Sequence, residues 1–294
     1  MATRQKLENR IYEPEHWEEV PCPVCKSTSS RIYERFGDRY QYTYNLCKDC
    51  SMVYASPRPR YDKQFIYDAY EFYAEDFDHF SSDLNTPGVK AQLALGRQEL
   101  LDFLPYCKSR GSFLDVGCET GRFLATAREY FDRVTGLEVS KSMAEFAARN
   151  LSIEVYTDLF ENLDNNLEFD CIRMSHVIEH IPDPHLWLEK ARSLLSEGGV
   201  LVINVPNIFS LSKQVKLLLR KWNIRPNRWE PWRTPDHLFE PTAKSMLKLL
   251  KMHGFKVMSH YTYSNRNPAS HGLLSGLMHR YLKKGNNLRF ITVT

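Results

Sequence analysis

The chain has 294 residues, of which 43% are hydrophobic and 26% charged, and these proportions exclude a disordered, collagen-like or coiled-coil protein. The formal net charge of +3 excludes the global basic field of proteins that wrap nucleic acid. No run approaches the roughly 18 apolar residues of a membrane span, and the start lacks the apolar segment of a signal peptide. We therefore expect a cytoplasmic protein.

Four of the seven cysteines form two CxxC pairs with 21 residues between them. They are Cys22, Cys25, Cys47 and Cys50. In a reducing compartment such spacing favours metal over disulfides, and four thiolates make a closed tetrahedral zinc shell. The intervening residues alternate like two short strands around a turn at Gly37-Asp38. Residues 1–60 are thus predicted to form a zinc ribbon stabilised by its metal, with buried dithiols lacking metal as the alternative.

The segment 61–88 follows the ribbon and is rich in aromatic residues up to residue 80. Their three- and four-residue spacing would place them on one broad face of a helix. We interpret this segment as a linker that packs on the larger domain. An aromatic lid over a cofactor or substrate is the alternative.

From residue 89 to residue 294, apolar runs of strand length alternate with amphipathic segments of helix length. Strands are expected near 112–117, 134–138, 153–156, 169–175, 200–205, 255–261 and 288–293. Helices are expected near 90–104, 120–131, 141–150, 184–196 and 242–253. This alternation predicts an α/β fold with a doubly wound, mostly parallel sheet, whose ligands bind beyond the carboxyl ends of the strands.

A glycine-containing loop, DVGCETG, follows the first of these strands. Gly117 and Gly121 would let the backbone turn tightly and approach a ligand at a helix N-terminus. Glu138 ends the next strand, where it can accept hydrogen bonds from both hydroxyls of a ribose. The loop lacks the Gly-Lys-Ser/Thr of a phosphate-binding loop, and Glu119 and Arg122 break the dinucleotide fingerprint. What remains is a loop for an adenosine ligand without phosphates.

These motifs carry a resemblance to a known family. LDVGCETGRF, VTGLEVS, FDCIRMSHVIEHIPDP and GGVLVINVPN resemble class I S-adenosylmethionine-dependent methyltransferases across residues 89–294. CPVC, CKDC and VYASPRPR are similar to the zinc-ribbon extension of one bacterial branch, often associated with sugar or cell-surface glycan modification. The resemblance implies a seven-stranded sheet that ends with an antiparallel strand.

The resemblance also implies positions for the cofactor S-adenosylmethionine. Asp115, Gly117 and Gly121 would line its methionine part, Glu138 would hold the ribose, and Asp158 would meet the adenine amino group. Ser175, at the end of the fourth strand, would complete this set.

Glu119 departs from the family, which usually has glycine at this position. Its side chain narrows the loop, and its carboxylate would repel that of the cofactor unless it turned to the ammonium or to solvent. An intact cofactor site is our expectation, and weakened binding or a pseudoenzyme is the alternative.

The loop after the fourth strand carries His176, Glu179 and His180. Methyl transfer to a hydroxyl needs in-line positioning and a base, and histidine suits the latter role near neutral pH. We expect His176 to be this base, with Glu179 and His180 orienting it or merely holding the loop.

Two metal-binding interpretations of this loop also arise. The spacing matches the inverted zinc-protease motif, but Pro182 and Pro184 prevent the long helix which that motif needs. Ubiquinone-type O-methyltransferases have a similar loop that can hold a divalent ion, with Glu where this chain has His176. That difference leaves a metal at His176, Glu179 and His180 open.

A basic insertion spans residues 208–233, with seven basic residues and one acidic residue, a net charge of +6. Part of it could form a basic amphipathic helix. It fits a solvated face over an aromatic lid, a site for a phosphate-bearing or lipid-linked acceptor, or peripheral contact with anionic lipid headgroups. Nucleic acid is not expected, because no nucleic-acid-reading motif accompanies the patch. His237 follows, where the resemblance places the acceptor pocket, and is a second candidate base.

Together these features predict an S-adenosylmethionine-dependent methyltransferase with structural Zn²⁺. O-methyl transfer to a hydroxyl of a small molecule or of a sugar or glycan precursor is the expected reaction. The alternative is a zinc-ribbon binding protein with a degenerate, non-catalytic methyltransferase fold.

Overall fold

The structure is a computed structural model, and it describes residues 13–36, 42–62, 86–222, 237–264 and 285–294. The predicted turn at Gly37-Asp38, nearly all of the aromatic segment and the second half of the basic insertion lie outside these ranges.

The centre of the fold is a seven-stranded sheet with the order β12-β13-β10-β9-β6-β7-β8. Its strands are β6 (Ser112–Val116), β7 (Arg133–Leu137), β8 (Glu154–Tyr156), β9 (Phe169–Ser175), β10 (Leu195–Pro206), β12 (Lys256–Tyr263) and β13 (Asn287–Val293). Neighbours from β10 to β8 pair in parallel, and β13 is antiparallel to both β10 and β12. This topology confirms the predicted doubly wound sheet with an antiparallel last strand. The strand order reverses between β6 and β9, where such sheets bind ligands.

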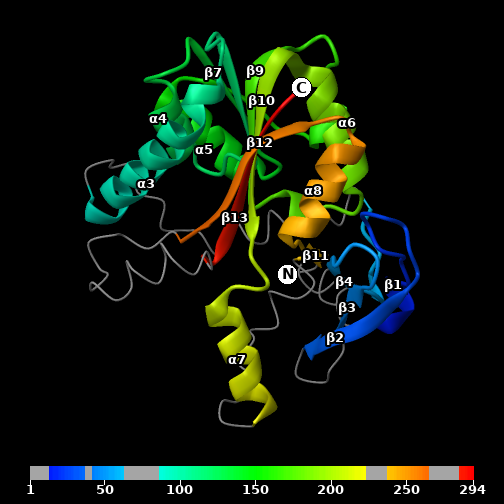
Figure 1. The fold of residues 1–294 in the computed structure, drawn as a ribbon. Helices are drawn as coiled ribbons and strands as arrows, with labels where there is room; N and C mark the ends of the chain where they lie inside the picture. The colour runs from blue at the N-terminus through cyan, green and yellow to red at the C-terminus, as the bar shows by residue number, and fades with distance from the viewer. Residues whose placement is uncertain (1–12, 37–41, 63–85, 223–236, 265–284) are drawn as a thin grey trace.

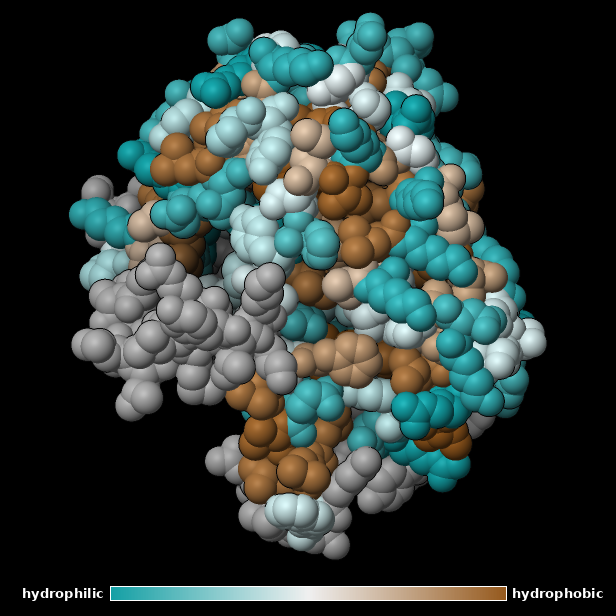
Figure 2. Space-filling model, in the orientation of Figure 1, coloured by the Kyte–Doolittle hydropathy of each residue, from teal (hydrophilic) through white to brown (hydrophobic). Residues whose placement is uncertain are grey.

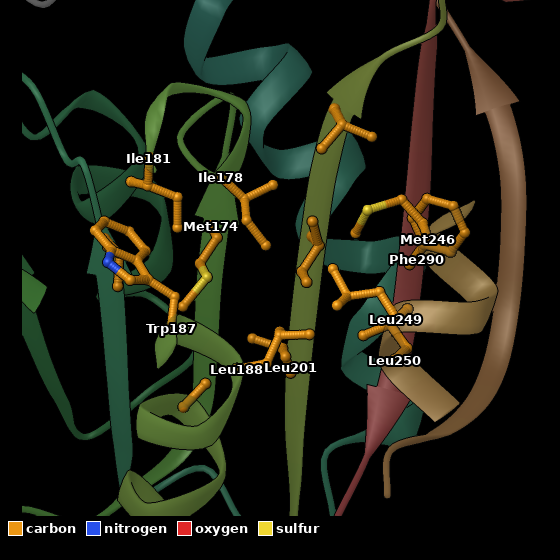
Figure 3. Close-up of a cluster of buried hydrophobic side chains, with 14 of the residues drawn as sticks. Met174, Ile178, Ile181, Trp187, Leu188, Leu201, Met246, Leu249, Leu250 and Phe290 are labelled. Atoms are coloured by element: carbon orange, nitrogen blue, oxygen red, sulfur yellow. The ribbon is translucent and has the colours of Figure 1, made fainter. Parts of the chain in front are cut away.

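Helices cover both faces of the sheet (Figure 1). One face carries α3 (Pro87–Phe103), α4 (Arg122–Ala127) and α5 (Lys141–Leu151), and the other carries α6 (Pro184–Leu194) and α8 (Ala243–Met252). Short 3-10 turns are η1 (Pro14–His16), η2 (Leu104–Tyr106), η3 (Phe160–Asn162) and η4 (Ile178–His180). Figure 3 shows the core beneath α6 and α8, where Trp187 and Leu249 are buried against the central strands.

The N-terminal ribbon is joined to this domain by a shared sheet. Its strands β2 (Ser30–Phe36), β3 (Tyr42–Cys47) and β4 (Val53–Ala55) form a sheet of order β11-β4-β3-β2. The edge strand β11 (Phe239–Glu240) belongs to the main domain and pairs with β4 of the ribbon. Two further strands of the ribbon, β1 (Trp17–Glu18) and β5 (Arg58–Pro59), form an antiparallel pair. Three of its cysteines belong to the same buried cluster as α6 and α8, so ribbon and main domain share a core.

The helix α7 (Leu211–Lys221) projects from the body of the molecule (Figure 1). It is the basic amphipathic helix predicted within the insertion. Apolar side chains on and beside it are exposed, with Val215 44%, Leu218 46% and Trp222 65% accessible, and Figure 2 shows the resulting apolar surface. Among the described residues, no helix combines the length and apolar character needed to cross a membrane.

Candidate functional site

The four ribbon cysteines converge in two pairs. Their sulfur atoms lie within 4.8 Å of one another, with Cys22 Sγ 3.4 Å from Cys50 Sγ and Cys25 Sγ 3.5 Å from Cys47 Sγ. A tetrahedral zinc ion, with bonds of about 2.3 Å to sulfur, needs sulfur atoms slightly farther apart than these pairs. The hydrogen bond with Cys50 lowers the pKa of the Cys22 thiol to about 5 although burial opposes the shift. The donor set fits Zn²⁺ without an open position for substrate.

The backbone of both cysteine pairs is shaped for this convergence. The residue that follows each pair, Lys26 or Ser51, has a positive φ, of 55° and 65° respectively. Each also donates its backbone N–H to the carbonyl of the first turn residue, Lys26 to Cys22 and Ser51 to Cys47. The two turns are therefore alike, as expected of two knuckles that hold one ion.

The glycine loop begins where β6 ends. Gly117 has a φ of +71°, and a Cβ there would lie 2.6 Å from Val177 Cγ2 in the loop after β9. Gly121 has a φ of +78° and caps α4, and a Cβ would lie 2.7 Å from Leu151 Cδ1. Both positions thus need glycine for backbone conformation and for space.

Glu138 follows β7 and is tied to the glycine loop. Its Oε2 accepts the backbone N–H of Glu119 at 2.9 Å, and its Oε1 accepts that of Ser140 at 3.0 Å. Burial raises the pKa of the carboxyl to about 7, against the lowering effect of these hydrogen bonds. Each carboxylate oxygen keeps a lone pair for a ligand hydroxyl.

Glu119 itself adopts a φ of +48°, in the left-handed region that glycine enters without steric cost. This conformation explains why glycine is usual at this position in the family that the loop resembles. Its side chain is exposed and lines the adjoining cavities.

Two cavities open at the carboxyl ends of β6, β7 and β9. The first, of about 280 Å³, is mostly apolar, and Leu137, Glu138 and Trp187 are among its lining residues. The second, of about 570 Å³, has more polar walls. Both are lined by Gly117, Glu119, Ser175 and His176. The predicted cofactor loop and the predicted base therefore meet at the junction of the two cavities.

Buried charges form the wall of the second cavity. The guanidinium of Arg173 donates to Glu99 at 2.7 Å and to Asp115 at 2.8 Å, and it lies 3.8 Å from the ring centroid of Phe123. Burial raises the pKa of the Asp115 carboxyl to about 6, and Arg173 limits that rise. Asp115 is thus positioned by an ion pair.

Arg289 extends this network to the last strand. It donates to Asp102 at 2.7 Å and to Asn204 at 2.8 Å, and its Nη2 lies 3.3 Å from Glu99. Asn204 in turn donates to Ser175 Oγ at 3.2 Å. The roles of Arg173 and Arg289 were not predicted from the sequence. Each is a single arginine inside a mainly apolar strand, a pattern that indicates a buried ion pair.

The loop after β9 holds His176 in a constrained position. Its φ is +57°, its backbone N–H donates to Asn204 O at 2.9 Å, and its Nδ1 lies 3.3 Å from Glu179 Oε1. Glu179 is completely buried. Burial would raise its pKa, but the hydrogen bond from His176 and the electrostatic effect of the neighbouring imidazoles of His180 and His237 outweigh this and lower it.

His237 reaches this loop from the segment before β11. Its ring lies edge-on to that of His180, with centroids 4.7 Å apart. His237 Nδ1 is 2.8 Å from Glu240 Oε1, and Lys213 donates to Glu240 Oε2 at 3.0 Å. The ribbon contributes as well, because Tyr44 Oη donates to the backbone carbonyl of His237 at 2.6 Å.

The predicted site residues are therefore placed unequally. Ser175, His176 and His180 line the first cavity, whereas Glu179 and His237 line neither cavity. Asp158 also lines neither, and its Oδ1 accepts hydrogen bonds from Leu159 and Asn162. The neighbouring Leu159 and Glu161 line the first cavity instead.

The main domain is similar to known proteins in sequence and in fold. The profile of a family of methyltransferase domains matches residues 89–260. Ubiquinone biosynthesis O-methyltransferase of Nitrobacter winogradskyi is 25% identical over 158 residues, which cover 50% of this chain and 60% of that protein. An uncharacterized protein of Methanocaldococcus jannaschii is 27% identical over 188 residues, 64% of this chain and 80% of the other. The match to the Nitrobacter enzyme thus spans less than two thirds of its length.

Solved structures share the fold at lower sequence identity. Magnesium protoporphyrin IX methyltransferase from Synechocystis, with bound SAH, matches with a TM-score of 0.55 and 12% identity, covering 79% of this chain and 99% of that one. An S-adenosylmethionine-dependent methyltransferase from Mesorhizobium loti matches with a TM-score of 0.53 and 16% identity, covering 69% and 100%.

Proposed function

Since the chain belongs to the family of S-adenosylmethionine-dependent methyltransferases, we propose that it methylates a hydroxyl of a small molecule or of a sugar or glycan precursor. The position of His176 carries this proposal. It lines both cavities, with Nδ1 turned to the buried carboxylate of Glu179. That pairing leaves Nε2 with its lone pair for a proton from the acceptor.

The residues around the first cavity would hold the adenosine end of the cofactor. Glu138 would accept hydrogen bonds from the ribose hydroxyls, and Leu137, Leu159 and Trp187 offer apolar contacts for a planar base. Asp115, fixed by Arg173, lines the second cavity and would face the methionine end. When bound, the cofactor supplies a methyl group on a positively charged sulfur.

The chain's own contribution to the transfer is placement and proton removal. Gly117 and Ser175 would hold the methyl donor where the two cavities join, and His176 would take the hydroxyl proton as the new bond forms. Glu179 would keep the His176 ring in one tautomer and stabilise its charge after protonation. Such a base typically contributes 10²- to 10⁴-fold to the rate.

Helix α7 supports an acceptor that carries a lipid or a phosphate. Its exposed apolar residues Val215, Leu218 and Trp222 follow helical spacing, and every charged residue from 208 to 222 is basic. An amphipathic basic helix of this kind binds anionic lipid surfaces. We expect co-sedimentation with vesicles that contain phosphatidylglycerol, and Leu218→Glu should abolish it.

The reaction type can be tested with cofactor labelled with ¹³C at the methyl group. Panels of hydroxylated small molecules, nucleotide sugars and lipid-linked sugars would be incubated with the protein, and products would be examined by NMR. The proposal predicts a methyl signal in the chemical-shift range of methyl ethers. A signal in the range of N-methyl or C-methyl groups would contradict O-methyl transfer.

A further inference from the structure

A cluster of three side chains lies where the loop after β9 meets the ribbon. One ligand atom from each of Glu179, His180 and His237 lies within 4.8 Å of the others. This set differs from the one predicted from the loop alone, because His237 takes the place of His176. His237 lies 57 positions after His180 in the sequence and precedes β11. One carboxylate and two imidazoles are ligands suited to divalent transition metals.

The carboxylate of Glu179 points to a missing ligand. The side chain is 0% exposed, and its Oε1 is the oxygen that faces His176 at 3.3 Å. Its Oε2 is fully buried and has no hydrogen-bond partner among the residues that the structure describes. A buried carboxylate oxygen without a donor is costly, and such atoms are rare in native structures. A cation bound by Glu179 would give this oxygen the partner that it lacks.

The surroundings of His237 resemble the outer shell of a metal-bound histidine. Its Nδ1 lies 2.8 Å from the buried Glu240 Oε1, so the proton sits on Nδ1 and Nε2 keeps its lone pair. Metal-ligating histidines commonly donate their other ring N–H to a carboxylate in this way. The Nζ of Lys213 donates a hydrogen bond of 3.0 Å to the second oxygen of Glu240, Oε2.

The backbone fastens the two sides of the cluster together. Leu238 N–H donates to the carbonyl of Glu179 at 2.9 Å, and Tyr44 of the ribbon donates to the carbonyl of His237. Strand β11, directly after Leu238, pairs with β4. Ligands around an ion with bonds of about 2.1 Å stand roughly 3.4 Å apart, so small side-chain rotations would close the set.

We propose that Glu179, His180 and His237 bind a divalent transition-metal ion, with coordination positions left open toward the cavity that His180 lines. This site is separate from the four-thiolate zinc site. Its role rests on the proposed methyl transfer to a hydroxyl, in which the ion would bind the acceptor oxygen. His176, which faces the other oxygen of Glu179, would take the hydroxyl proton as the oxygen–carbon bond forms and the sulfur–carbon bond breaks. The ribbon would thereby complete the acceptor side by holding one ligand in place.

The test uses the full chain with its ribbon zinc in place and Co²⁺ as the probe. One additional Co²⁺ per chain should bind, with ligand-field bands and without the intense charge-transfer bands of cobalt–thiolate bonds. Glu179→Gln and His237→Gln should each weaken this binding at least tenfold. Glu240→Gln, which removes no ligand, should weaken it by about 10- to 100-fold as outer-shell changes do.

His16→Gln is the matched control, because His16 belongs to another potential cation cluster, with Glu13 and Glu15. It should bind Co²⁺ as the unaltered chain does. Binding of SAH by calorimetry and the thermal midpoint of each variant verify that the fold and cofactor site persist, so loss of Co²⁺ alone bears on this site. Failure of the zinc-loaded chain to bind this one Co²⁺, or equal affinity in His237→Gln, would overturn the proposal while leaving methyl transfer intact.

Discussion

The backbone N–H of Glu119 donates a 2.9 Å hydrogen bond to Oε2 of Glu138. This bond connects the glycine loop after β6 to the end of β7, and so it joins the two parts of the proposed cofactor site. It depends on the left-handed backbone of Glu119, whose φ is +48°. The main chain at position 119 is therefore useful, whereas its side chain adds a negative charge beside the site.

Replacing Glu119 by glycine should raise the affinity for SAH several-fold. The backbone can keep its positive φ without steric cost, and the carboxylate near the cofactor's own carboxylate is removed. Calorimetric titration with SAH measures the change in affinity. Glu119→Gln removes the charge and keeps the size of the side chain, so it separates the effect of the charge from that of the side-chain volume. Weaker binding in both variants would instead show that Glu119 binds the cofactor's ammonium group.

Cofactor affinity should rise between pH 6 and pH 8. Burial raises the pKa of the Glu138 carboxyl to about 7, so the carboxylate that we propose to accept the ribose hydroxyls is lost as the pH falls below that value. The affinity at pH 6 is expected to be lower by up to about tenfold. Titrations with SAH across this range should show the slope, and Glu138→Gln should remove it. An unchanged slope in that variant would assign the dependence to another group.

Gly117→Ala should destabilise the protein by about 1 to 3 kcal/mol and weaken SAH binding at least tenfold. A Cβ there meets Val177 Cγ2 at 2.6 Å, and the φ of +71° is unfavourable for alanine. Urea denaturation and calorimetry measure the two effects. Gly88→Ala is the matched control, because no atom of the described residues lies within 4 Å of a Cβ at that position. Equal effects at both positions would contradict the close contact of the two loops.

Removal of zinc should destabilise the whole chain rather than the ribbon alone. Cys22, Cys47 and Cys50 are buried in the same cluster as Trp187 and Leu249, so loss of the metal disturbs the core beneath α6 and α8. Chelation, or Cys22→Ser, should lower the midpoint of one cooperative thermal transition followed by circular dichroism. Two separate transitions, or an unchanged midpoint, would show that the ribbon folds independently.

The central sheet could be predicted from the sequence because its signals are local. Strands such as β9 and β10 are mainly apolar segments between amphipathic helices, and the glycine loop is a short contiguous motif. The ion pair between Arg173 and Asp115 could not be predicted from local sequence patterns, because the two residues are 58 positions apart in the sequence. An arginine in an apolar strand signals burial with a partner but does not identify it.

The cluster of Glu179, His180 and His237 could be predicted from the sequence only in part, for a related reason. His237 was recognised as a candidate, but its contact with the loop after β9 depends on β11, a two-residue strand that pairs with the ribbon. So short a strand has no periodic pattern to reveal it. Glu240 and Tyr44 were missed because their roles exist only once that pairing brings the ribbon beside His237.

The most direct test of the proposed mechanism compares turnover with cofactor affinity in His176→Gln. With an acceptor identified from the labelled panel, formation of SAH should fall at least 100-fold, as expected for loss of a general base, while the dissociation constant of SAH changes less than threefold. Turnover close to that of the unaltered chain, or an equal loss of turnover and affinity, would contradict the role of His176 as the base.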